Sequence, residues 1–313
     1  MQRGAWSVVA AIASRDRERA ERASIELGIP TVHASYEALL ADPSVEAVYI
    51  PLPNHLHVPW SIRAAEAGKH VLCEKPLGLG AGDVRTLIGV RDRTGVRLQE
   101  AFMVRTHPQW LAAREMVQSG RLGDVRAMLG VFSYMNTDPT NIRNILDFGG
   151  GALLDIGCYF VMTSRFIFGG EPRRVVASID RDPALHVDRR TSMLLEFPSG
   201  TFAGTCSTQM TPDQRIEILG SRARLVIEIP FNAPPDRPCR LWFDERGALG
   251  GGTIETMELE ACDQYTIQGD AFSQAIREGT DVVYPLEESL ANMRVLDALF
   301  RSAARGEWVA VTE

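Results

Sequence analysis

The expected fold is organised around the stretch Val71-Leu72-Cys73-Glu74-Lys75-Pro76. An apolar strand ends here in a carboxylate and an ammonium, and Pro76 stops the strand pairing because proline has no backbone N–H. In an open parallel sheet, ligands bind just outside the carboxyl ends of the strands. Lys75 is therefore a candidate functional residue. The alternative is an exposed ion pair at a strand end, which contributes little to stability.

Strands and helices alternate on both sides of this stretch. Apolar runs predict strands over residues 7–13, 45–50, 71–73 and 96–102. Amphipathic or Ala-rich segments predict helices over residues 16–27, 35–40, 55–67 and 83–94. This alternation implies right-handed βαβ crossovers and a doubly wound parallel sheet.

The character of the sequence changes after residue 105. Hairpins are predicted at the turns Pro198-Ser199-Gly200 and Gly220-Ser221-Arg222, each flanked by apolar runs. Helices are predicted over residues 107–119, 152–168, 266–278 and 286–305. The expected fold class is α/β, with a Rossmann-like parallel sheet domain over residues 1–105. An α+β domain with a large, mostly antiparallel sheet follows over residues 106–313.

Composition excludes several classes of partner. The 313 residues carry a net charge of −7, so there is no basic footprint for nucleic acid or for an anionic membrane. No apolar run approaches the roughly 20 residues that span a bilayer. The five cysteines are scattered, without a C-x-x-C pair, so neither a metal site nor a disulfide framework is expected. A reducing cytoplasm fits this pattern.

The end of the first predicted strand carries Ser14-Arg15-Asp16. In a dinucleotide fold an acidic residue here binds the ribose hydroxyls of NAD, whereas an arginine accommodates the 2′-phosphate of NADP. Ser14 and Arg15 are thus candidate cofactor-binding residues, with NADP preferred and NAD possible. The alternative is that Ser14 or Asp16 caps the following helix while Arg15 is solvated.

The next strand ends in Pro51-Leu52-Pro53-Asn54-His55-Leu56-His57. The two prolines favour an extended backbone that cannot enter the helix early. Asn54 is expected to cap the following helix and to turn its backbone toward a ligand. The alternative is a rigid turn with a cap and no ligand.

The glycine-rich turn of a Rossmann domain is not where it is expected. The G-x-G-x-x-G fingerprint follows the first strand, but only three residues precede Gly4. The nearest substitute is Gly78-Leu79-Gly80-Ala81-Gly82, which has different spacing and follows a different strand. A flexible helix entry is the favoured interpretation, and a phosphate cradle is the alternative.

A second candidate cluster begins at Gly149-Gly150-Gly151 and continues into a helix with Asp155 and Tyr159. These two residues are four apart, so they share a helix face. A phenol serves as acid or base if a neighbouring ammonium lowers its pKa from about 10. The alternative is a buried tyrosine with a satisfied hydroxyl. Arg105 lies at the junction of the two expected domains.

Four motifs together resemble the Gfo/Idh/MocA oxidoreductases over essentially the whole chain. They are E-K-P at residues 74–76, P-L-P-N-H-L-H at 51–57, E-A-F-M-V-R-T-H-P-Q at 100–109 and G-G-G-A-L-L-D-I-G-C-Y at 149–159. The resemblance implies a Rossmann domain, an α/β substrate domain and NAD(P). It also implies hydride transfer at a carbinol carbon of a sugar or polyol. Tyr159, where many relatives have His, is similar to the branch of glucose–fructose oxidoreductase, NADP-dependent aldose 1-dehydrogenases and dihydrodiol dehydrogenases.

The resemblance also implies residue roles. Lys75 and Tyr159 would be the catalytic pair, with Tyr159 deprotonating the hydroxyl and Lys75 holding the substrate oxygen. Asp155 and Arg105 would line the substrate. The expected cofactor contacts are Ser14, Arg15, Leu52, Pro53, Asn54, His57, Glu74, Lys75 and Arg143. The partner would be a small sugar or polyol, and a homodimer or homotetramer would form through the C-terminal sheet.

Two further expectations concern the missing glycine-rich loop. A non-catalytic NADP-binding relative is the alternative function, although such a protein has no need of an acid/base pair. The resemblance places residues 1–6 at the end of a helix that follows the first strand of the family. Met1 is therefore expected to be an internal start, about 25–30 residues inside the reading frame. The chain is then expected to bind NADP poorly and to aggregate.

Overall fold

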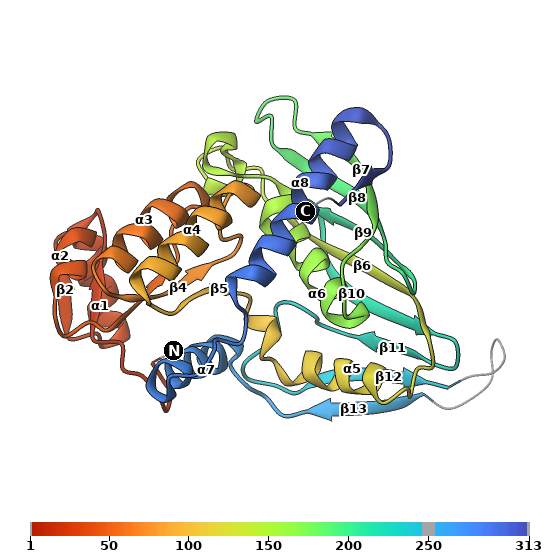
Figure 1. Ribbon diagram of the computed structural model, residues 1–313, viewed down its shortest axis with the longest axis horizontal. Helices are drawn as coiled ribbons and strands as arrows, with labels where there is room; N and C mark the ends of the chain where they lie inside the picture. Colours follow the sequence, from red (N-terminus) through yellow and green to blue (C-terminus); the bar gives the residue numbers. More distant parts are fainter. Residues whose placement is uncertain (1, 246–253, 312–313) are drawn as a thin grey trace.

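The computed structural model describes residues 2–245 and 254–311, so Met1, the expected internal start, lies outside the described residues. Figure 1 shows parallel strands and helices in the N-terminal half, and a large sheet in the other half. The long helix α8 (Leu286–Arg305) runs between the two. The arrangement confirms the predicted fold class.

The first half alternates strands and helices as the sequence predicts. Its strands are β1 (Ala11–Ala13), β2 (Thr31–His33), β3 (Ala47–Ile50), β4 (His70–Glu74) and β5 (Leu98–Ala101). Its helices are α1 (Arg17–Leu27), α2 (Tyr36–Ala41), α3 (Asn54–Glu66) and α4 (Ala81–Thr94). All pairing is parallel, in two separate sheets: β1 with β2, and β3, β4 and β5 in that order. Among the described residues no ladder joins β1 to β3.

The first strand is shorter than predicted. Only the last three residues of the run 7–13 pair, because β2 offers only three partners and no other described strand lies alongside. Val8 is consequently 86% exposed, where the apolar pattern predicts a buried strand. The prediction for residues 7–10 is wrong, since a strand needs a hydrogen-bonding neighbour to stay extended.

Local capping explains most helix ends. The Asp16 carboxylate accepts the Arg19 N–H at the start of α1, and Gly28 ends the helix with φ 66°. Ser35 caps α2 in the same way. Asn54 does not cap α3 as predicted: Pro53 occupies the cap position without a side-chain bond. The Asn54 amide instead donates to the Gly149 carbonyl at 2.9 Å, across the domain junction.

The second half is built on one nine-stranded sheet. Its strand order is β13-β12-β11-β10-β6-β9-β8-β7-β14, antiparallel except between β6 and β9. The bounds are β6 (Val125–Met135), β7 (Arg174–Arg181), β8 (Asp188–Glu196), β9 (Thr201–Ser207), β10 (Gln209–Gly220), β11 (Arg224–Ile227), β12 (Cys239–Asp244), β13 (Glu255–Leu259) and β14 (Val309–Ala310). Both predicted hairpins, β8–β9 and β10–β11, are present.

Helices pack on one face of this sheet (Figure 1). They are α5 (Pro108–Gln118), α6 (Cys158–Phe168) and α8, with short 3₁₀ turns η1 (Met103–Arg105), η2 (Ile142–Asn144) and η3 (Leu146–Phe148). Helix α7 (Gln264–Glu278) packs instead against the parallel sheet, where Phe272 meets Leu72 and Ala101. A π-helical turn, η4 (Leu153–Gly157), leads into α6. Residues Leu146–Phe168 are apolar enough by length and composition to cross a membrane, but 94% of the most apolar window is buried. Burial of this kind is what a core helix shows.

Helix α8 ties the two halves together. The Asp297 carboxylate accepts the Ala81 N–H at 3.0 Å, at the start of α4. Arg91, near the end of α4, forms a two-pronged ion pair with Glu287. These contacts hold the parallel strands at a fixed position beside the large sheet.

Candidate active site

Lys75 lies directly after β4 and reaches into the second half of the molecule. Its ammonium donates to the Asp155 backbone carbonyl and lies 3.4 Å from the Asp155 Oδ1. Both side chains are 12% exposed. Burial alone lowers the pKa of Lys75, but the Asp155 carboxylate outweighs it and raises the pKa above the ordinary value. Lys75 is therefore a fixed ammonium at neutral pH.

Asp155 is the centre of the cluster. Besides Lys75, its carboxylate meets the Arg143 Nε at 3.2 Å and the Tyr134 hydroxyl at 2.5 Å. Burial raises the pKa of Asp155, but the two cations overcome it and hold the pKa below the ordinary value. A carboxylate so occupied acts as an orienting anion rather than as a base.

The glycines before Asp155 allow a close backbone approach. Gly151 has φ 116°, and a Cβ there would lie 1.8 Å from the Asp188 carboxylate. A Cβ on Gly150 would lie 2.5 Å from the Arg143 carbonyl. The Gly151 N–H donates to that same carbonyl at 2.9 Å. Only glycines let the chain pass between these groups and enter the π-helical turn that carries Asp155.

Tyr159 faces Lys75 with its ring rather than with its hydroxyl. The Lys75 ammonium lies 4.9 Å from the ring centroid. The hydroxyl donates to the Met103 Sδ at 3.3 Å, and the ring packs against Phe102, Phe132 and Phe231. Burial raises the pKa of Tyr159 well above its ordinary value, so the expected lowering by an ammonium is wrong for this arrangement. Asp155 and Tyr159 nevertheless both contact Lys75, the first through its carboxylate and the second through the face of its ring.

Tyr134 was not expected from the sequence. It lies on β6 on the same side of the strand as Met128 and Phe132, and its hydroxyl bonds to Asp155. Burial, and then the Asp155 carboxylate, raise the pKa of Tyr134. The one signal in the sequence was that Tyr134 follows Met128, Gly130 and Phe132 on alternate positions of the strand, the side that faces inward.

The other expected residues divide into two groups. Arg143 joins the cluster at Asp155, and Glu74 accepts the Tyr49 hydroxyl and the Lys75 N–H beside it. Arg105 does not join it: its guanidinium stacks on Phe166, 4.1 Å from the ring centroid. Burial lowers the pKa of Arg105, which has no carboxylate bond there. This placement differs from the expected substrate-lining position, because aromatic faces take up the guanidinium.

The loop from Pro51 to His57 lies next to the cluster. The Leu52 carbonyl faces the His57 Nε2, and Pro53 occupies the cap position before α3. Both ring nitrogens of His57, a side chain only 1% exposed, face backbone carbonyls, those of Leu52 and Pro76. His57 therefore lies beneath the site, with no ring nitrogen available for a direct cofactor contact.

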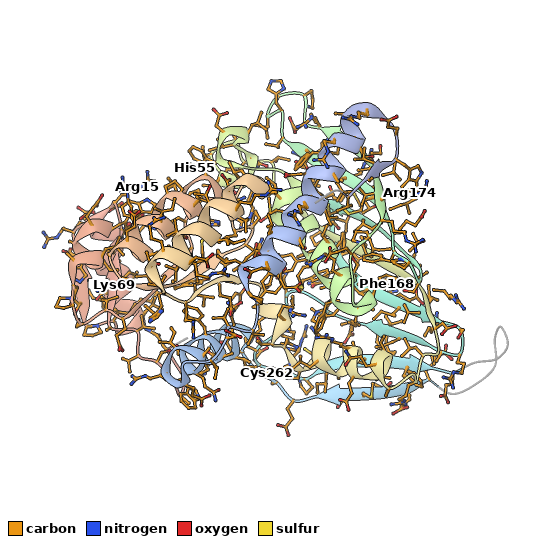
Figure 2. The ribbon with its side chains drawn as sticks, in the orientation of Figure 1. Arg15, His55, Lys69, Phe168, Arg174 and Cys262 are labelled. Atoms are coloured by element: carbon orange, nitrogen blue, oxygen red, sulfur yellow. The ribbon has the colours of Figure 1, made fainter. Side chains whose placement is uncertain are left out.

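Ser14 and Arg15 are the residues expected to contact the 2′-phosphate of NADP. They follow β1 at its carboxyl end, and Asp16 is occupied as the cap of α1. In the part of the chain that the structure describes, the Arg15 guanidinium has no ion pair. Figure 2 shows Arg15 and His55 along the upper edge of the N-terminal half. A free guanidinium beside a hydroxyl suits a phosphate monoester.

The loop from Gly78 to Gly82 does not cradle phosphate. Its Leu79 N–H is taken by the Asp83 carboxylate at 2.8 Å and its Ala81 N–H by Asp297. Two carboxylates at these amides would repel an anion. This agrees with the favoured interpretation of the stretch as a helix entry.

Comparison with known proteins agrees with this geometry. The model of the oxidoreductase family with an NAD-binding Rossmann fold matches residues 1–102, and the Gfo/Idh/MocA C-terminal domain matches residues 110–226. An uncharacterized oxidoreductase from Rhizobium meliloti is 50% identical over 97% of this chain and 91% of its own length. A D-xylose 1-dehydrogenase (NADP+) from Haloferax volcanii is 40% identical over 95% of this chain and 90% of its own length.

Solved structures give the same assignment. A 3-ketoreductase from Actinomadura kijaniata, in complex with TDP-benzene and NADP, superposes with a TM-score of 0.86 at 30% identity. The match covers 96% of this chain and 91% of that one. Family models, relatives and fold agree, and the chain belongs to the Gfo/Idh/MocA family of NAD(P)-dependent oxidoreductases.

Proposed function

We propose that this protein interconverts a carbinol and a carbonyl group of a sugar or polyol, with NADP as the redox cofactor. The observation that carries the proposal is the convergence of Lys75, Asp155 and Tyr159 at the carboxyl end of β4. A buried ammonium oriented by a carboxylate, next to a phenol, is the equipment for moving a proton at an oxygen atom.

The bound nicotinamide supplies or accepts the hydride. Lys75 binds the reacting oxygen and stabilises the negative charge that develops on it. Asp155 keeps the Lys75 ammonium in place. The raised pKa of Tyr159 keeps the phenol protonated at neutral pH, the form that donates a proton when a carbonyl is reduced. Oxidation requires the phenolate, which the nearby ammonium favours and burial opposes.

The residues that would hold NADP lie on both halves of the molecule. Ser14 and Arg15 would bind the 2′-phosphate. The loop of Leu52, Pro53 and Asn54 would lie along the cofactor, with Glu74, Lys75 and Arg143 near the nicotinamide. The NADP named for the xylose dehydrogenase and present with the ketoreductase supports this preference.

The test is a substrate panel read at the absorbance band of the reduced nicotinamide. Aldoses, polyols and trans-dihydrodiols are offered with NADP+ and with NAD+, and keto sugars with the reduced cofactors. We expect turnover with at least one sugar-like compound and faster turnover with the phosphorylated cofactor. Binding of NADP without any turnover across the panel would instead support a non-catalytic relative.

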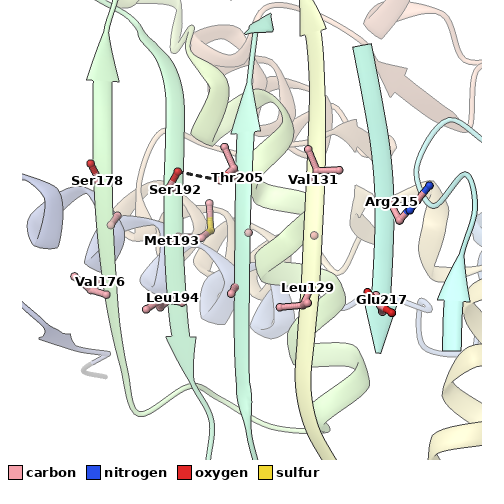
Figure 3. A pocket seen from close by; sticks show the side chains of 14 residues that line it. Leu129, Val131, Val176, Ser178, Ser192, Met193, Leu194, Thr205, Arg215 and Glu217 are labelled. Atoms are coloured by element: carbon pink, nitrogen blue, oxygen red, sulfur yellow. Dashed lines mark hydrogen bonds between the residues drawn. The ribbon is translucent and has the colours of Figure 1, made fainter. Parts of the chain in front are cut away.

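The outer face of the large sheet is the proposed assembly surface. Opposite the helices it carries a hollow of about 630 Å³ whose side chains include Leu129, Val131, Val176 and Leu194 (Figure 3). Leu129 and Leu194 are 41% and 38% exposed. The Ser192 and Thr205 hydroxyls bond to each other at 2.9 Å across this face. Exposed apolar side chains gathered on a sheet indicate a partner.

We infer that the partner is a second copy of the chain. Arg215 and Glu217 lie two residues apart on β10, on the same face as the apolar patch. A two-fold axis beside them would pair each arginine with the partner's glutamate, as an isologous interface requires. Light scattering should give a dimer or tetramer for the native chain and a smaller species for Leu129→Asp with Leu194→Asp. Monomeric native protein would exclude this surface.

A cytoplasmic location completes the proposal. All five cysteines are free thiols, and four of them are buried. Free thiols persist in a reducing compartment. A fractionation in which the activity leaves the cytoplasm would contradict it.

A further inference from the structure

The peptide group between Pro76 and Leu77, just beyond Lys75, is held from both sides. The His57 Nδ1 lies 2.7 Å from the Pro76 carbonyl oxygen, and the Glu100 Oε1 accepts the Leu77 N–H at 2.8 Å. These two backbone groups belong to one peptide unit. An imidazole from α3 and a carboxylate from β5 therefore grip the same plane of atoms.

Both gripping side chains are fully enclosed. His57 is 1% exposed and Glu100 is 0% exposed, so neither is available to a ligand. Burying two ionisable groups is costly unless each makes well-placed hydrogen bonds. Here the bonds go to the loop of the catalytic lysine. Neither residue touches the Lys75, Asp155 and Tyr159 side-chain cluster by a hydrogen bond.

His57 also reaches a second loop. Its Nε2 lies 2.6 Å from the Leu52 carbonyl, in the loop proposed to lie along the cofactor. Burial lowers the pKa of His57, against the pull of the two carbonyls, so the neutral ring with one N–H is favoured. The neutral ring has a single proton: on Nδ1 it holds the Lys75 loop, and on Nε2 it holds the Leu52 loop. Only the doubly protonated ring holds both loops at once.

We propose that His57 and Glu100 are positioning residues that fix Lys75 by clamping the peptide group after Pro76, and that His57 couples this clamp to the cofactor loop. The inference rests on the proposed catalytic role of Lys75. It assigns to the two residues no contact with substrate or cofactor. Their effect passes through the backbone that carries the ammonium to Asp155.

Two substitutions of His57 separate its two bonds. In His57→Asn the amide nitrogen replaces Nδ1, so the Pro76 bond stays and the Leu52 bond is lost. In His57→Gln the amide nitrogen replaces Nε2, so the Leu52 bond stays and the Pro76 bond is lost. We expect kcat about tenfold lower in His57→Gln, the effect of one hydrogen bond, with little change in the KM for NADP. His57→Asn should show the reverse, a kcat within about threefold of native and a raised KM for NADP.

Two substitutions of Glu100 test the bond on the other side of the peptide group, the one to the Leu77 N–H. Glu100→Gln keeps an acceptor for the Leu77 N–H, and Glu100→Leu removes it at similar size. We expect kcat close to native in the first and about tenfold lower in the second. The reactivity of Lys75 toward an amine-directed acylating reagent, read by peptide mass spectrometry, gives a measurement independent of turnover. Acylation of Lys75 should be faster in His57→Gln than in His57→Asn, and faster in Glu100→Leu than in Glu100→Gln.

A purely structural role would lower the melting temperature of all four variants without separating kcat from KM. Equal kcat in His57→Asn and His57→Gln, with equal acylation of Lys75, would overturn the inference. Lys75→Ala is measured alongside. If Lys75→Ala keeps the native kcat, the proposed function is wrong. If Lys75→Ala loses kcat while the two His57 variants have equal kcat and the two Glu100 variants have equal kcat, only the positioning role of His57 and Glu100 is wrong.

Discussion

The Lys75 ammonium lies above the ring of Tyr159, 4.9 Å from its centroid, and not beside the hydroxyl. The ammonium is thus attracted by the ring face while Asp155 holds it from the other side. The phenol hydroxyl points to Met103. This arrangement makes the two residues separable by substitution, because the ring and the hydroxyl of Tyr159 do different things.

Removing the hydroxyl of Tyr159 should affect chemistry and leave the fold. Tyr159→Phe keeps the ring under Lys75, so we expect native-like unfolding and a kcat lower by about 10²–10⁴. Lys75→Ala should lower kcat by a similar factor. Tyr36→Phe is the control, since the Tyr36 ring, in α2, packs on Trp60 of α3 and not on the Lys75 cluster. Native kcat in Tyr159→Phe at neutral pH would point to a solvent proton donor.

Arg15 should set the choice of cofactor. Arg15→Ala removes a charge-assisted contact to the 2′-phosphate, of about 1.5–3 kcal/mol. The kcat/KM with NADP should fall about 10–100-fold, while the value with NAD stays the same. The neighbouring Arg17→Ala, which removes only an exposed pair with Glu21, is the control. An equal loss with both cofactors would show that Arg15 does not contact the 2′-phosphate.

Gly151 should tolerate no side chain. Gly151→Ala places a Cβ 1.8 Å from the Asp188 carboxylate at φ 116°. Backbone strain alone costs about 1–3 kcal/mol, and the clash adds to it. Urea unfolding should show a loss of at least this size. Gly170→Ala, where no atom lies within 4 Å of the added Cβ, should stay within about 1 kcal/mol of native. Similar stabilities for the two variants would contradict the close approach.

Asp188 should make stability fall as the pH rises. Burial raises the pKa of Asp188 to about 6, from about 3.9 in the unfolded chain. A raised pKa in the folded state contributes stability below the unfolded value and loses it as the pH rises through the folded value. The contribution is at most about 3 kcal/mol. Between pH 4 and pH 7 the unfolding free energy should therefore decline less in Asp188→Asn than in native protein. The exposed Asp213→Asn should follow native protein, and identical slopes in all three would refute the assignment.

Local sequence signals predicted the elements well. Asp16, Ser35 and Gly28 mark helix ends through their own side chains or backbone, so the boundaries of α1 and α2 follow from nearby residues. The 20 residues of α8 match the predicted range, because a long amphipathic pattern is hard to mistake. The motifs likewise predicted that Lys75 follows a strand and that Asp155 and Tyr159 lie on a helical segment.

What sequence missed depends on distant contacts. Asn54 bonds to Gly149, 95 positions away, instead of capping its own helix. The pKa of Tyr159 depends on three phenylalanines and on the degree of burial, which spacing alone does not reveal. The role of Tyr134 and the contacts of His57 and Glu100 at Pro76 could not be predicted for the same reason. Each of these side chains acts through a partner that is distant in the sequence.

The bond from Asp297 to the Ala81 N–H spans 216 residues. Gly80, at the start of α4, has no side chain to cap the helix itself. During synthesis α8 leaves the ribosome long after α4 has emerged. Until then the Ala81 N–H is hydrogen-bonded to water rather than to the Asp297 carboxylate. The start of α4 therefore gains this hydrogen bond only when almost the whole chain has been made.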